Sequence, residues 1–95
     1  MADRPAMIDK FKARLDAWTA EIEKLSAKAR ESEADARIRA EKELETLRAQ
    51  RDELQSRLDD LRTASGDAWK DVASGMERAW SELELAGRRA ADRFG

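Results

Sequence analysis

The chain has 95 residues, enough for one domain with a small core, and 42% of them are charged against 5% aromatic, a balance typical of long solvated helices. It contains no cysteine and no histidine, so disulfides, thiolate chemistry and the usual general base and metal ligand are excluded. Nineteen Lys and Arg against 21 Asp and Glu leave a formal charge of −2, which argues against a protein that coats nucleic acid.

These exclusions point away from catalysis. We expect no enzyme, catalytic residue, cofactor, metal site or small-molecule substrate, because the common nucleophile and base pairs all need residue types that are missing. No apolar run approaches the roughly 18 to 20 residues of a membrane span, and residues 1–30 mix charges without the apolar segment of a signal peptide. We therefore expect a cytoplasmic protein.

A single long helix is predicted over residues 5–63. Its first half carries an apolar stripe in steps of three and four residues, the spacing of a left-handed coiled coil. Between residues 26 and 39 the stripe thins to alanines, while Ala, Glu and Arg keep the helix propensity high. We interpret this thinning as a stutter in the packing and not as a break in the helix.

The stretch TASGDAWKD, residues 63–71, interrupts this pattern. Gly66 follows the cation Arg62, which suits a helix C-terminus, and Asp67 is a good N-cap for a following helix. The order of these stop and start signals predicts a turn over residues 63–67. The alternative is one unbroken helix of ~85 residues, since a glycine inside a helix costs only about 1 kcal/mol.

A second helix is predicted over residues 67–94, folded back on the first as an antiparallel hairpin. Gly75 and Gly87 lie within it and let a neighbouring helix approach closely. The fold class is therefore all-α: one domain over residues 1–95 in which a long coiled-coil helix is followed by a shorter one. The residues expected to pack in the hairpin are Leu54, Leu58, Leu61, Trp69, Val72, Met76, Trp80 and Leu83.

The hairpin predicts self-association. At 1.5 Å per residue the second helix reaches back only about 40 Å along a first helix of nearly 90 Å, so residues 6–32 are left uncovered. That arm carries too much apolar surface for water, and we expect a homodimer or higher oligomer formed through it. The residues involved are Ile8, Phe11, Leu15, Trp18, Ile22 and Leu25.

A second hypothesis places the protein on a membrane surface. Trp69 and Trp80 are eleven residues apart and share one face of the second helix, which is amphipathic and so suited to lie in a lipid interface. Against this, residues 67–84 hold two basic and five acidic side chains, a balance of −3 that anionic lipid would repel.

With these features in place, the chain resembles the small bacterial coiled-coil proteins assigned to a stress-response family, known from cyanobacteria and proteobacteria. The segments that carry the resemblance are LDAWTAEIEKLSAKA, ELETLRAQRDELQSRLDDL and ASGDAWKDVASGMERAWSELELA. The matching positions are Trp18, Gly66, Asp67, Ala68, Trp69 and Trp80. The resemblance implies a cytoplasmic, all-helical protein linked to environmental stress, without established catalytic residues or cofactor. The leading hypothesis is thus a non-enzymatic, oligomeric structural or interaction protein.

Overall fold

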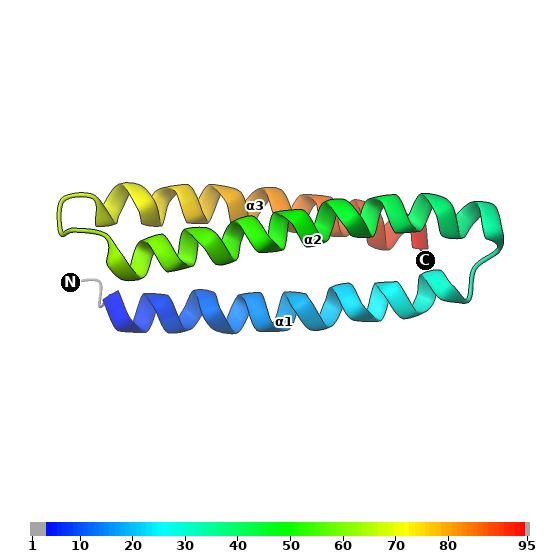
Figure 1. Cartoon of the computed structure of the whole chain (residues 1–95), viewed down its shortest axis with the longest axis horizontal. Coiled ribbons are helices and arrows are strands. Elements are labelled where there is room, and N and C mark those ends of the chain that lie inside the picture. Colours follow the sequence, from blue (N-terminus) through cyan, green and yellow to red (C-terminus); the bar gives the residue numbers. More distant parts are fainter. Residues whose placement is uncertain (1–3, 95) are drawn as a thin grey trace.

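The computed structural model describes residues 4–94, with side chains to residue 92, and in this range the chain forms three helices and no strand. Helix α1 spans Arg4–Arg30, α2 spans Ala34–Thr63 and α3 spans Trp69–Phe94. Successive helices run antiparallel and lie side by side in a rod of 50 × 18 × 17 Å (Figure 1). The all-α prediction is confirmed.

The expectation of one helix over residues 5–63 is wrong, because the chain bends between α1 and α2. Residues 31–33 leave the helix, and Glu33 takes an extended conformation with φ −60° and ψ 158°. No glycine or proline marks this bend, which is why the sequence pattern missed it. The bend falls where the apolar stripe thins, so a straight helix would gain little packing there, whereas folding back lets α1 cover α2.

The arm expected to be uncovered is therefore covered within the chain. Phe11, Leu15, Ile22 and Leu25 are buried, and Ile8 and Trp18 are partly buried and pack against the same core. α2 supplies Leu44, Leu47, Leu54, Leu58 and Leu61 to that core, and α3 supplies Met76, Trp80 and Leu83. The apolar surface from which the sequence predicts self-association is thus satisfied without a second copy.

The connection between α2 and α3 covers residues 64–68 and contains Gly66 and Asp67. Ser65, and not the expected Asp67, provides the capping oxygen: its hydroxyl accepts the Ala68 N–H at 3.3 Å. The Ser65 carbonyl accepts the Trp69 N–H at 2.9 Å. No residue in the described range has a positive φ, so Gly66 does not adopt the left-handed conformation that favours glycine.

The residues expected to pack between the last two helices lie mostly in the core. Leu54, Leu58 and Leu61 are fully buried on α2; on α3, Met76, Trp80 and Leu83 are buried, while Trp69 and Val72 are partly buried. α2 packs along its length against both other helices, whereas α1 and α3 touch each other at few positions. The seam between α1 and α3 is therefore the open side of the bundle.

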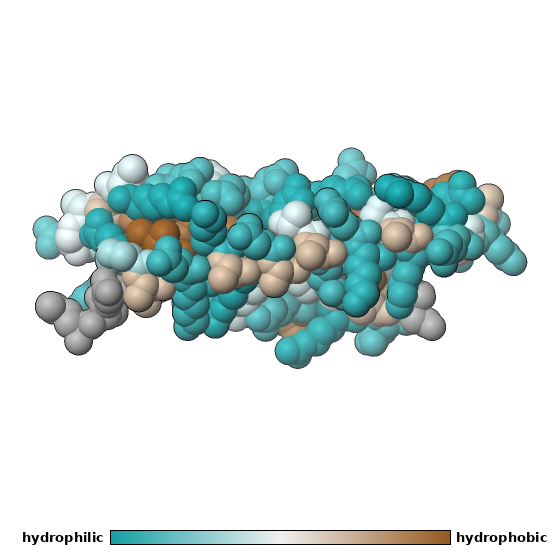
Figure 2. Space-filling model, turned by 90° about the horizontal axis from the view of Figure 1, so that it is seen from below, coloured by the Kyte–Doolittle hydropathy of each residue, from teal (hydrophilic) through white to brown (hydrophobic). Residues whose placement is uncertain are grey.

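Little apolar surface reaches the outside of the rod. Figure 2 looks onto α1 and shows a mostly hydrophilic face with small hydrophobic patches. Among the described residues, the large hydrophobic side chains that are exposed are Ile38 and Leu85. None of the three helices combines the length and the apolar character that crossing a membrane requires.

Candidate functional site

The open side of the bundle holds an apolar groove, which we call the α1–α3 groove. It has a volume of about 430 Å³. It exists because α1 and α3 both pack on α2 and diverge from each other. Its lining residues are Arg14, Ala17, Trp18, Glu21, Leu25, Trp80, Gly87, Arg88 and Ala91.

Trp18 lies directly on the backbone of Gly87, and both residues line this groove. A Cβ atom placed on Gly87 would overlap the Cη2 and Cζ2 atoms of the Trp18 ring, so the ring would have to move. A glycine inside a helix costs about 1 kcal/mol relative to alanine. At this position the missing side chain permits the close approach of an aromatic ring. Gly87 thus sets how deeply Trp18 enters the seam.

Each tryptophan of α3 is covered by an arginine of α1. The guanidinium carbon of Arg14 lies 5.6 Å from the Trp80 ring centroid and 5.7 Å from that of Phe11, and that of Arg4 lies 5.7 Å from the Trp69 ring. Arg4 also donates a hydrogen bond to the Ala64 carbonyl at 2.8 Å. These are cation–π contacts, each worth about 0.5–1 kcal/mol when partly exposed.

The indole N–H groups differ in how they are satisfied. Trp80 Nε1 donates to the Glu84 carboxylate one turn along α3. Trp18 Nε1 and Trp69 Nε1 are buried and have no hydrogen-bond acceptor within the described part of the protein. A buried donor without an acceptor costs free energy, so both indoles weaken the seam between α1 and α3.

The lining of the groove holds more basic than acidic side chains, unlike the chain as a whole. Arg14 and Arg88 line it against one acidic residue, Glu21, and Arg14 also forms an ion pair with Glu77 of α3 at 3.8 Å. The whole chain has a formal charge of −2. An apolar groove with a cationic rim favours an apolar ligand that carries negative charge at its edges.

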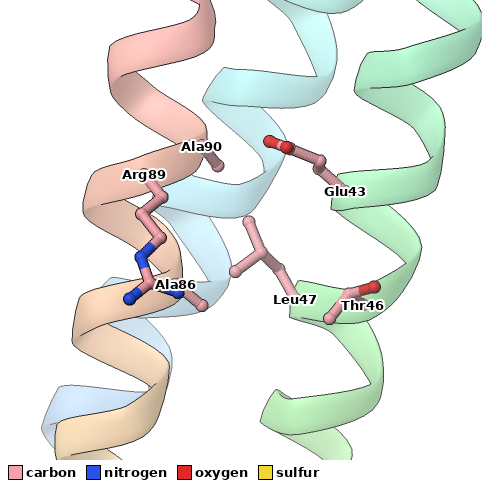
Figure 3. Close-up of a pocket in the computed structure, with 6 residues that line it drawn as sticks. All are labelled: Glu43, Thr46, Leu47, Ala86, Arg89 and Ala90. Atoms are coloured by element: carbon pink, nitrogen blue, oxygen red, sulfur yellow. The ribbon is translucent and has the colours of Figure 1, made fainter.

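A second, smaller depression of about 260 Å³ lies between α2 and α3. Figure 3 shows Leu47 of α2 directed toward Ala86 and Ala90 of α3, with the Glu43 carboxylate near Ala90 and Arg89 running along its own helix. The lining of this depression is more polar than that of the α1–α3 groove. We regard the α1–α3 groove as the better candidate site.

A third recess joins α1 to α2 and is basic. Arg30, Arg48 and Arg51 line it, and Arg48 donates to the hydroxyl of the buried Ser26 at 3.3 Å. Arg51 is already paired with Asp52 at 3.0 Å. Sequence reasoning missed this cluster because its arginines come together only through the bend at residues 31–33.

The sequence-predicted site residues therefore separate into two groups. Trp18, Leu25 and Trp80 line the α1–α3 groove, whereas the remaining predicted packing residues belong to the core or lie against it. Arg14 was not identified from the sequence, since only the position of α1 beside α3 gives it a role. The sequence did contain a signal for Gly87, because a glycine in the interior of a predicted helix indicates a close approach by a neighbouring group.

Residues 4–94 contain no group of three or more acidic side chains arranged to hold a metal ion. No protein-family model, characterised protein or solved structure matches the chain.

Proposed function

We propose that the chain is a non-enzymatic helical interaction protein that binds an amphipathic helix with acidic flanks in the α1–α3 groove. The observation that carries the proposal is the groove itself, an apolar channel with two tryptophans and two arginines on the open side of a three-helix bundle. A fourth helix laid there would bury apolar surface along both α1 and α3, in the way that amphipathic helices enter hydrophobic grooves.

The chemistry of the lining supports this type of partner over a small substrate. Tryptophan and arginine are the residues most often found at the energetic centres of protein interfaces. Trp18 and Trp80 are already held by packing, so little side-chain freedom is lost on binding. The absence of histidine and cysteine from the sequence supports a non-enzymatic role.

Three further expectations belong to the same proposal. Coiled-coil packing between the helices is supported by the three- and four-residue spacing of the buried and partly buried apolar positions of α1, which are Phe11, Leu15, Trp18, Ile22, Leu25 and Ala29. Self-association remains part of the proposed function, although the apolar arm from which the sequence predicts an oligomer is covered within the chain. The resemblance to stress-response coiled-coil proteins supports a scaffolding role under stress in the cytoplasm.

The groove is tested with the apolar, anionic dye 8-anilinonaphthalene-1-sulfonate and three variants in which an alanine is replaced by a charged residue. Ala91 lines the groove and is exposed, so Ala91→Glu adds negative charge there and Ala91→Arg adds positive charge without disturbing the core. We expect saturable dye fluorescence that Ala91→Glu lowers at least about tenfold in affinity and Ala91→Arg preserves, as charge complementarity requires. Ala27→Glu, on an exposed position of α1 outside the lining, is the matched control. Equal dye binding by all four proteins would refute the groove as the binding site.

A second candidate function, binding to a lipid surface, is favoured by α3. It is the most amphipathic of the three helices, and Trp69 and Trp80 lie on its apolar side. Opening α3 from the bundle would break the arginine–tryptophan contacts, the Arg14–Glu77 ion pair and the Trp18–Gly87 contact on the α1 side. It would also break the whole aliphatic packing on the α2 side. The test is tryptophan emission with circular dichroism during titration with neutral and anionic vesicles. A blue shift with retained helix supports lipid binding, and unchanged emission at every lipid ratio contradicts it.

A further inference from the structure

The bend between α1 and α2 lacks the features that normally hold a bend. Its sequence from residue 30 to residue 35 is RESEAD, without glycine or proline, and every described residue has a negative φ. Glu33 differs from a helical residue mainly in ψ, which is 158°, because its φ of −60° is already helical. Rotation about a few ψ angles therefore makes α1 and α2 one continuous helix.

The hydrogen bonds within the bend itself are local and few, and the packing of α1 on α2 holds the two helices together. The Glu31 and Ser32 N–H groups donate to the Lys28 and Ala29 carbonyls, each at 3.1 Å, and the Ser32 hydroxyl donates to the Lys28 carbonyl at 3.3 Å. Arg37 donates to the Ser32 carbonyl at 3.4 Å. The N-cap residue Glu33 makes no side-chain capping hydrogen bond, so the first amides of α2 lack the partner that a capping side chain would supply.

A continuous helix would satisfy those amides with the last carbonyls of α1. The segment also has the composition for it, since Ala, Glu and Arg are good helix formers and Glu33 with Arg37 is a favourable i,i+4 pair once both are helical. The other connection behaves differently, because Ser65 caps the N-terminus of α3 and Gly66 lowers helix propensity there. Only the first bend is poised to straighten.

If the bend straightens, α1 leaves α2 and uncovers Phe11, Leu15, Ile22 and Leu25. The surface it leaves on α2 and α3 fits α1 itself: the leucines of α2, the Trp80 ring for Arg14 and the Gly87 backbone for Trp18. A second copy in the same straightened form carries an identical α1 and an identical vacated surface, so two copies can satisfy each other with two-fold symmetry.

We propose that this chain forms a domain-swapped homodimer, in which residues 4–63 become one helix and each α1 packs on the α2 and α3 of the second copy. Every contact of α1 in the single chain is remade between chains, and only the bend changes. Short connections of this type favour exchange because relieving them stabilises the open form. The proposal is independent of the partner helix in the α1–α3 groove, since the swapped dimer contains two such grooves, each built from both chains.

A proline variant separates the two forms. In Ala34→Pro, proline occupies the first residue of α2, where its missing N–H and its fixed φ are tolerated and where it favours the extended conformation of Glu33. The same proline lies in the interior of a continuous helix. We expect Ala34→Pro to remain a folded monomer and to weaken dimerisation at least about 100-fold, as the penalty of proline inside a helix requires. Ser32→Ala, which raises helix propensity and removes the Ser32 hydrogen bond, is expected to strengthen dimerisation.

The experiment is light scattering after size exclusion over a range of protein concentrations, combined with cross-linking. The chain has no cysteine, so Glu23→Cys with Arg51→Cys places its only two thiols in one recess, one on α1 and one on α2. A short bismaleimide applied to the isolated dimer should link two chains on a denaturing gel, and applied to the monomer it should link within one chain. A dimer linked only within each chain, a chain that stays monomeric at all concentrations, or an Ala34→Pro protein that dimerises like the parent would each overturn the proposal. The cysteine variant keeps the natural sequence of the bend, so the cross-linking test remains valid even if the proline variant fails to fold.

Discussion

The two interfaces of α1 differ in chemistry. Toward α2, the helix contributes to an aliphatic and aromatic core in which Phe11 and Ile22 are buried and the leucines of α2 are almost fully excluded from water. Toward α3, the contacts include two arginine–tryptophan stacks, the Arg14–Glu77 ion pair at 3.8 Å and the Trp18 ring on Gly87. The first interface is stabilised by buried area, and the second depends on the geometry of a few side chains.

This difference indicates which interface fixes the fold and which is available for function. The α1–α2 interface buries side chains worth about 1.5–3 kcal/mol each, so it determines that the helices associate. The α1–α3 interface has weaker contacts and a groove, and its indole N–H groups at Trp18 and Trp69 have no acceptor among the described residues. A partner can improve the second interface but can add little to the first.

The largest expected effect is at the α1–α2 interface. Phe11→Ala removes a ring that is fully buried, and such truncations cost about 3–5 kcal/mol because a cavity remains. A domain of this size has a total stability on the order of 5–14 kcal/mol, so the variant should lose a large share of it. Urea unfolding followed by circular dichroism measures the loss. A midpoint close to that of the parent protein would show that α1 does not depend on this core.

The next effect is at the α1–α3 interface and has an unusual sign. Alanine normally stabilises a helix relative to glycine, but Gly87→Ala places a Cβ about where the Trp18 ring lies, and the ring must move. We expect the free energy of unfolding to fall by about 1–3 kcal/mol, the range for overpacking. A red shift of tryptophan emission should accompany it.

The cause of that loss can be isolated with a double-mutant cycle. In a Trp18→Leu background the obstructing ring is absent, so Gly87→Ala should become neutral or stabilising. The same loss in both backgrounds would mean that Gly87 is needed for another reason and that Trp18 does not define the seam.

Sequence patterns predicted the chemistry of the first interface better than that of the second. The spacing of Phe11, Leu15 and Ile22 identified a stripe that had to be buried, because burial depends on the residues themselves. It did not identify what covers the stripe, since the bend at residues 31–33 has no glycine or proline and is decided by long-range packing. The α1–α3 groove exists only because of that bend, so it could not be predicted from the sequence.

The contribution of the arginine stacks is expected to be smaller. Arg14→Met keeps the apolar stem that covers Trp80 and Phe11 but removes the charge, so the cation–π contacts and the exposed ion pair with Glu77 are lost while the packing remains. We expect a loss of about 1 kcal/mol in the free energy of unfolding. Lys12→Met, at an exposed position of α1, controls for the removal of a positive charge. Equal losses in the two variants would indicate a general charge effect.

The smallest effect is predicted on α3 away from the groove, and it tests whether the behaviour of Gly87 is local. Gly75 lies on the same helix, and a Cβ there would meet only the terminal Nη1 of Arg57 at 3.2 Å, the flexible end of a long side chain that can move aside. Gly75→Ala should therefore follow the helix propensity and stabilise the protein by about 0.5 kcal/mol. Opposite signs for the two glycine variants, measured by urea unfolding under the same conditions, would assign the cost at Gly87 to Trp18. If both variants destabilise, α3 itself resists added side chains, and the comparison between the two interfaces of α1 loses its basis.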